Sequence, residues 1–154
     1  MKDKKPLTPQ EAFVKAASYC AYQERCHQEV QEKLQTFGLK RDEIDEVISR
    51  LIEENFLNEE RFAKAFAGGK FRVKKWGRLK IKHALQQKDV SEYSIRKGLQ
   101  EIDPNDYYAT LVELAESKRE QLKDKNARQA LYTYLAGKGF EPNLIQEVIG
   151  DLEV

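Results

Sequence analysis

The chain has 154 residues, of which 40% are hydrophobic and 34% are charged, with only 8 glycines and 4 prolines. This composition favours helix over sheet and a thin, extended body over one with a thick core. No apolar run approaches the roughly 18 residues that a membrane-spanning helix needs. Residues 1–6 lead into an amphipathic stretch rather than a signal-peptide core, so we expect a cytoplasmic protein with no membrane segment.

The formal net charge of +1 conceals a strongly basic central segment. Residues 61–88 contain ten Lys or Arg and no Asp or Glu, whereas the rest of the chain has 17 basic and 26 acidic residues. A segment without acidic residues of its own has no local partners for its cations. The middle of the chain is therefore predicted to face a negatively charged partner.

The chain begins with a predicted helix at Thr8-Pro9-Gln10-Glu11, which has the sequence of a capping box with proline at the first helical position. Asn58 and Asp103-Pro104 give similar start signals further along the chain. The helical spacing predicts an inner face for each of these three helices. The predicted inner residues are Phe13, Ala16, Ala17 and Cys20; Phe62, Ala65 and Phe66; and Tyr108, Leu111 and Ala115.

After each of these helices, six apolar positions recur with spacings of 51 and then 50 residues. The three sets are Val30, Leu34, Leu39, Ile44, Ile48 and Leu51; Ile81, Leu85, Val90, Ile95, Leu99 and Ile102; and Leu131, Leu135, Phe140, Ile145, Ile149 and Leu152. Within each set the spacing indicates a short helix, a tight turn and a second helix. Gly38 and Gly139 occupy the turn where a left-handed conformation is expected, and Asp89 takes that place in the second copy.

The sequence thus predicts an all-α protein made of three tandem three-helix repeats, at residues 1–57, 58–102 and 103–154. A unit of about 50 residues buries too little apolar surface to be securely stable alone, so neighbouring units should stack. Stacking produces an elongated, curved array with a long surface, which suits a polymeric partner better than a small molecule. We expect a monomer.

Four sets of short motifs follow one another within residues 12–150. They are Tyr19-Cys20-Ala21-Tyr22-Gln23-Glu24-Arg25-Cys26-His27-Gln28-Glu29-Val30, Lys33-Leu34 and Gly38; Asn55-Phe56-Leu57-Asn58-Glu59-Glu60-Arg61-Phe62-Ala63; Gly77-Arg78 with Ile81 and Leu85; and Tyr134-Leu135, Lys138-Gly139-Phe140 and Ile145. Together these motifs resemble the signatures of the RecX family. One departure is Cys26, where many members carry Ser. The motif residues singled out are Arg25, Arg61, Phe62, Gly77, Gly139 and Phe140.

This resemblance implies a cytosolic regulator of DNA repair and recombination, including the SOS response. Such a protein lodges against the RecA nucleoprotein filament, caps or destabilises it, and suppresses ATP hydrolysis and strand exchange. It also implies a protein that is not an enzyme and has no cofactor.

Within the basic segment, seven cations alternate with Phe71 and Trp76. They are Lys70, Arg72, Lys74, Lys75, Arg78, Lys80 and Lys82. On a continuous helix these charges would wrap around the axis, and they predict contact with single- or double-stranded DNA or with an acidic surface of RecA. The alternative is a solvated face neutralised by the acidic segment 42–60, and Trp76 is expected in the core.

Other features allow structural interpretations. Gly68-Gly69 is either a hinge or a site of close helix packing, and packing is the more ordinary explanation. We expect Cys20, Cys26, His27 and His83 to be structural, with reduced cysteines, because their spacing fits no zinc pattern. Two interpretations are open for the acidic residues near the C-terminus, contact with a basic partner or a solvated helix face. These residues are Glu141, Glu147, Asp151 and Glu153.

Two further functional hypotheses remain open. Three-helix units resemble helix-turn-helix domains, so an autonomous DNA-binding module is the main alternative. A protein-interaction scaffold is the other. Catalysis is a distant third, because no catalytic triad, phosphate-binding glycine loop or metal site stands out.

Overall fold

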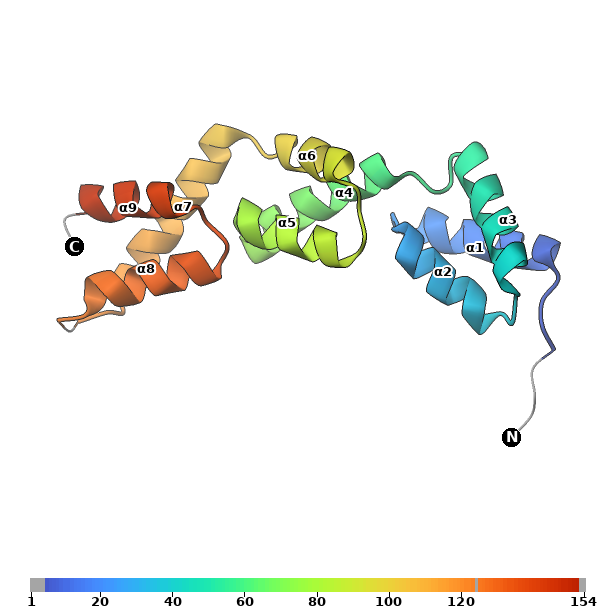
Figure 1. Cartoon of the computed structure of the whole chain (residues 1–154). Coiled ribbons are helices and arrows are strands. Elements are labelled where there is room, and N and C mark those ends of the chain that lie inside the picture. The colour runs from blue at the N-terminus through green and yellow to red at the C-terminus, as the bar shows by residue number, and fades with distance from the viewer. Residues whose placement is uncertain (1–4, 124, 153–154) are drawn as a thin grey trace.

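The structure is a computed structural model that describes residues 5–123 and 125–152. Within this part of the chain every regular element is helical. The elements are α1 (Pro9–Tyr22), α2 (His27–Thr36), α3 (Arg41–Glu53), α4 (Glu59–Gly69), the π-helical turn η1 (Lys70–Lys74), α5 (Arg78–Gln87), α6 (Glu92–Gln100), α7 (Pro104–Arg119), α8 (Ala127–Gly137) and α9 (Pro142–Asp151). Figure 1 shows α1–α3, α4–α6 and α7–α9 as successive groups along an elongated row. The predicted all-α array of three-helix units is confirmed.

Each unit opens with a helix whose start is fixed by a side-chain cap. The Thr8 hydroxyl accepts a hydrogen bond from the Glu11 amide at 3.1 Å, and the Glu11 carboxylate accepts one from the Thr8 amide at 3.0 Å. Asn58 caps α4 through the Arg61 amide at 2.8 Å, and Asp103 caps α7. These side chains satisfy amide groups that have no partner inside the helix, as the start signals predicted.

The turn between the second and third helix of each unit has a left-handed residue, as predicted. The φ angles are +82° at Gly38, +60° at Asp89 and +99° at Gly139. Aspartate is one of the few residues other than glycine that adopts this conformation routinely. The same backbone turn therefore recurs in all three units despite the change of residue.

The repeated apolar positions form the interior. All are buried except Leu99 and Leu152, which are partly buried and pack against the core. The first unit surrounds a core of its own, whereas α4–α9 share one continuous core. Cys26, at the N-cap of α2, belongs to this second core, so it marks the seam between the two.

Two predicted inner faces are shifted from the observed ones. Tyr107, rather than Tyr108, is buried in α7, and Ala65 is exposed in α4 while Ala63 is buried. The reason in α4 is its packing against α6, where a Cβ at Gly98 would lie 2.7 Å from the Ala63 carbonyl oxygen. Small residues at this crossing allow the two helices to approach closely.

Candidate anion-binding surface

The basic segment folds into three parts rather than one continuous helix. Helix α4 continues through Gly69 into the π-helical turn η1, which ends at Lys75 in a left-handed conformation with φ +57°. The short link that follows, through Gly77, leads into α5. The predicted distribution of charge around a single helix axis is therefore wrong, because the π turn and the link redirect the side chains that follow them.

Gly68 and Gly69 do not interrupt α4. The nearest atoms to a Cβ at Gly68 belong to the Arg72 side chain, and a Cβ at Gly69 would meet nothing within 4 Å. The close helix packing expected of these two glycines is found at Gly98 instead.

Trp76 contacts two lysines of the basic segment. Its side chain packs against the core of α4–α9 but is only partly buried. The prediction that Trp76 is a core residue is therefore only partly correct. The Nζ atoms of Lys70 and Lys80 lie 4.9 Å and 4.6 Å from its ring centroid. An aromatic face attracts a cation, so Trp76 holds both lysines close to the surface of the second unit.

A lysine of the third unit, which lies outside the predicted basic segment, joins this surface. The Lys138 ammonium donates a hydrogen bond to the Lys74 carbonyl at 2.7 Å. Burial lowers the pKa of Lys138, and the positive charges of Lys80, Lys75 and Lys74 lower it further. We call Lys74, Lys75, Lys80 and Lys138 the cationic cluster, because the first three lie close enough to Lys138 to act on its charge.

The cationic cluster is poorly neutralised. Lys75 lies 3.9 Å from Glu113, and the other three lysines form no ion pair with the described residues. No ion pair joins any of the seven candidate cations to the acidic segment 42–60, within residues 5–123 and 125–152. The proposed neutralisation by that segment is therefore wrong. The arrangement can attract an anion, since several cations without counter-charges raise the local positive potential.

Arg78 differs from the other candidate cations because it is engaged within the molecule. Its Nη1 lies 2.8 Å from Glu141, and its guanidinium stacks 3.8 Å from the centroid of the Tyr107 ring. The buried Tyr107 hydroxyl accepts a hydrogen bond from the Arg78 amide at 2.9 Å and donates one to Glu141. Burial and the bond to Glu141 raise the pKa of Tyr107 above its usual range. These groups link the second and third units.

Beside this network the backbones of the two units touch. The Gly77 amide donates to the Lys138 carbonyl at 2.7 Å, and the Leu79 amide donates to the Gly139 carbonyl at 3.0 Å. A Cβ at Gly77 would lie 2.2 Å from the Gly139 carbonyl carbon. Glycine is therefore the residue that allows this contact, which we call the glycine joint. Phe140 packs next to it, 5.1 Å from Tyr107.

A different contact, which we call the arginine joint, links the first and second units. The Arg61 guanidinium bonds to Glu24 at 2.6 Å and to the carbonyls of Asn55 at 3.0 Å and Phe56 at 3.3 Å. The neighbouring Phe62 is buried. Arg61 therefore fixes the loop between α3 and α4 against the end of the first helix.

The arrangement of three joined units matches known proteins. Family models for the first, second and third three-helix domains of RecX match residues 12–51, 58–99 and 105–149. The chain belongs to the RecX family. No helix within residues 5–123 and 125–152 combines the length and apolarity that a membrane crossing requires.

Curated relatives and solved structures agree with this family. The regulatory protein RecX of Prosthecochloris aestuarii is 30% identical over 143 residues, which cover 92% of this chain and 93% of that protein. The Clostridium perfringens strain 13 RecX is 34% identical over 130 residues, 81% of this chain but only 60% of that protein. The crystal structure of RecX from Lactobacillus salivarius has a TM-score of 0.85 at 23% identity, covering 95% of this chain and 97% of that one, which shows a shared fold.

The RecX motif residues build the joints. Gly77, Gly139 and Phe140 form the glycine joint, and Arg61 forms the arginine joint. Arg25 is likewise engaged locally, since its guanidinium lies 3.7 Å from the Tyr19 ring centroid and donates to the Tyr19 carbonyl. The motif therefore keeps the three units in fixed positions, whereas the cationic cluster lies beside one of the joints.

The remaining candidates from the sequence are the two cysteines and the two histidines. Cys20 and Cys26 are free and buried, and burial raises the pKa of both thiols, that of Cys26 to about 11. The Glu29 carboxylate caps the start of α2 by accepting a hydrogen bond from the Cys26 amide at 2.9 Å. The buried Nδ1 of His27 has no hydrogen-bond partner among the described residues, and His83 is exposed. The part of the chain that the structure describes contains no group of three or more potential metal ligands.

The acidic residues near the C-terminus do not act as one group. Glu141 faces Arg78 and Tyr107, whereas Glu147 and Asp151 are exposed on α9. Glu153 lies outside the described residues.

Proposed function

We propose that this chain binds the RecA–DNA filament and restrains the recombinase, with the cationic cluster as a principal contact. Membership of the RecX family supports the regulatory role. The observation that carries the contact is that Lys74, Lys80 and Lys138 form no ion pair with the described residues, although they lie together at a rigid joint. The anion is either a DNA phosphate or a carboxylate on the filament surface.

Restraint requires no chemistry by this chain. A ligand that binds one state of the filament more tightly than another shifts the population toward the state that it prefers. An elongated body fits this role, because it offers contacts along a polymer rather than around a small molecule. If the surface neutralises about five phosphates, the logarithm of the binding constant falls by about 4 to 5 per tenfold rise in salt.

The test is RecA ATPase activity on single-stranded DNA, with this chain titrated in. Replacing Lys74, Lys80 and Lys138 together with alanine should abolish most of the inhibition and reduce the salt dependence by about one unit per lysine that contacts phosphate. Arg78 is left intact, because its ion pair with Glu141 supports the fold. Circular dichroism verifies that the variant is folded.

A matched control replaces three exposed cations elsewhere, Lys15, Arg41 and Arg119, with alanine. The control has the same net charge as the cluster variant and should inhibit like the unmodified chain. Equal inhibition by the cluster variant and the unmodified chain would reject these lysines as the contact.

The same cluster also suits an autonomous DNA-binding module, because phosphates are its natural counter-charges. Filter binding without RecA separates the two functions. Tight, sequence-selective binding favours the autonomous module, whereas weak, salt-sensitive binding agrees with a filament regulator. If neither DNA nor RecA association responds to charge reversal at Lys74, Lys75 and Lys80, the protein-interaction scaffold is favoured.

A further inference from the structure

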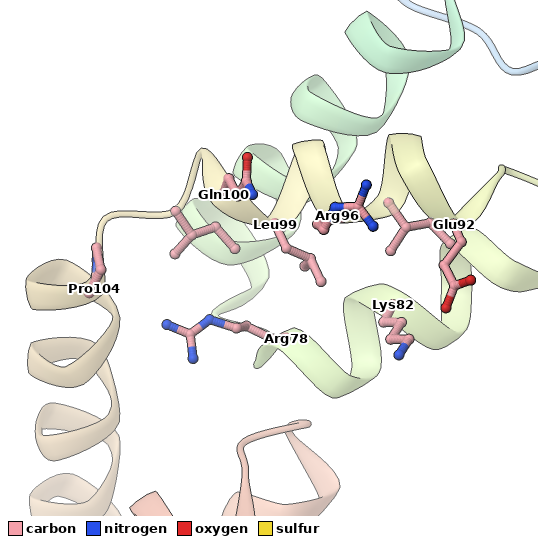
Figure 2. Close-up of a pocket in the computed structure, with 9 residues that line it drawn as sticks. Arg78, Lys82, Glu92, Arg96, Leu99, Gln100 and Pro104 are labelled. Atoms are coloured by element: carbon pink, nitrogen blue, oxygen red, sulfur yellow. The ribbon is translucent and has the colours of Figure 1, made fainter.

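A cleft between α5, α6 and the start of α7 is lined by residues other than the four lysines of the cationic cluster. Its volume is about 500 Å³. Figure 2 shows it bordered by Arg78 and Lys82 of α5, by Glu92, Arg96 and Leu99 of α6, and by Pro104 at the start of α7. We call it the α5–α6 cleft. None of the lysines of the cationic cluster lines it.

The floor of the cleft is apolar. Ile95 and Ile102 are buried in its base at 3% and 4% exposure, and Leu99 is partly exposed. Figure 2 shows the Leu99 side chain pointing from α6 into the space above α5. A concave apolar floor of this size accommodates a bulky aliphatic or aromatic side chain, and burying such a side chain supplies binding energy.

The rim of the cleft carries cations. Lys82 and Arg96 are exposed and form no ion pair with the described residues. Arg78 uses Nη1 to bind Glu141, and its Nε and Nη2 donors make no hydrogen bond within the described chain. Arg78 is already paired with Glu141, and the one carboxylate that lines the cleft, Glu92, does not neutralise both Lys82 and Arg96.

The cleft is built before any partner arrives. Arg78 is fixed by Glu141 and by stacking on Tyr107, and α6 is fixed by its close approach to α4 at Gly98. At the other end, Asp103 caps α7 immediately before Pro104. A preformed site loses little conformational freedom on binding.

From these observations we infer that the α5–α6 cleft binds an acidic peptide segment of a protein partner, with one bulky apolar side chain on the floor. Leu99 provides the apolar contact, and Lys82 and Arg96 bind the flanking carboxylates. A nucleic acid suits the cleft less well, because its phosphates gain nothing from the apolar floor and lose hydration there. The inference does not rest on the RecA proposal, since it concerns other residues and is measured with the purified chain alone.

The experiment measures fluorescence polarisation of a labelled peptide, Asp-Glu-Leu-Phe-Asp-Glu, as the full chain is titrated in. Binding is expected for this peptide but not for one with Ala-Ala in place of Leu-Phe, or one with lysines in place of the acidic residues. Leu99→Ala and the pair Lys82→Gln/Arg96→Gln should each weaken binding about tenfold, the effect of losing one important contact. Circular dichroism shows whether each variant is folded.

A matched control, Lys74→Gln/Lys80→Gln, removes the same charge from the cationic cluster and should bind the peptide like the unmodified chain. Three outcomes would overturn the inference. The first is that the unmodified chain does not bind the peptide, and the second is that all variants bind it equally well. The third is that oligothymidylate displaces the peptide from the unmodified chain and does not bind to the cleft variants. The last result would assign the cleft to nucleic acid.

Discussion

The two joints of this chain hold neighbouring units by different means. At the glycine joint two backbones touch, with hydrogen bonds of 2.7 and 3.0 Å between main-chain groups. At the arginine joint one long side chain spans the gap, and Arg61 and Glu24 remain 38% and 27% exposed. Main-chain contact tolerates no extra atom, whereas an exposed side-chain bridge is weakened by solvent.

The hydrophobic cores show the same contrast. Helices α4–α9 share one core across the glycine joint, while α1–α3 enclose a separate one. We therefore expect the second and third units to unfold together and the first unit to open more independently. Stability in an array of repeats depends on such interfaces as much as on the units themselves.

The largest effect should come from Gly77→Ala. Its φ of −76° suits any residue, so the penalty is steric alone, from a Cβ only 2.2 Å from the Gly139 carbonyl carbon. Backbone must move to make room, and we expect a loss of about 3 kcal/mol or more in the free energy of unfolding. Urea denaturation measures it.

The control for this substitution is Gly137→Ala, because a Cβ at Gly137 meets nothing within 4 Å. Alanine is the better helix former, so this change should be neutral or stabilising by up to about 1 kcal/mol. Equal stability of the Gly77→Ala variant and the unmodified chain would show that the two backbones do not touch.

A smaller, local effect is expected from Arg61→Lys. Lysine keeps the charge facing Glu24 but cannot also donate to the carbonyls of Asn55 and Phe56. With allowance for the partial exposure of the pair, we expect a loss of about 1 kcal/mol. Hydrogen exchange should rise in residues 54–58 and at the end of α1, and stay unchanged in α7–α9.

Arg41→Lys serves as the control, because Arg41 is exposed at the start of α3. If hydrogen exchange in α7–α9 rises as much as in the loop, the two joints are coupled and the contrast between them fails.

The sequence was sufficient to predict the fold because its signals are local and repeated. The caps at Thr8, Asn58 and Asp103 each lie within a few residues of the amides that they satisfy. All but two of the recurring apolar positions, Leu99 and Leu152, are buried. Spacing alone does not decide which residues of a helix face inward. Tyr107 shares a helical face with Leu111 and Ala115, but the spacing of Tyr108 from the same two residues is also typical of one face.

The candidate site was only partly predictable, because tertiary contacts decide it. Lys138 lies far along the chain from Lys74, and nothing in its spacing indicates that the glycine joint brings them together. The acidic partners of Lys75 and Arg78, Glu113 and Glu141, come from the third unit for the same reason. A stretch of basic residues thus predicts the charge of a surface but not which of its cations remain free.

The smallest expected effect concerns the two buried thiols, which lie in different cores. Opening of the arginine joint alone should expose Cys26 at the seam and leave Cys20 inside the first unit.

Both thiols should react slowly with a disulfide reagent at pH 8, since a pKa of about 11 leaves only about one Cys26 thiol in a thousand ionised. In single-thiol chains made with Cys20→Ala or Cys26→Ala, adding Arg61→Lys should speed the labelling of Cys26 by about fivefold, equivalent to about 1 kcal/mol, and leave that of Cys20 unchanged. Equal acceleration of both thiols would mean that the first unit unfolds whenever the joint opens, because its own core would then be too weak to survive without Arg61.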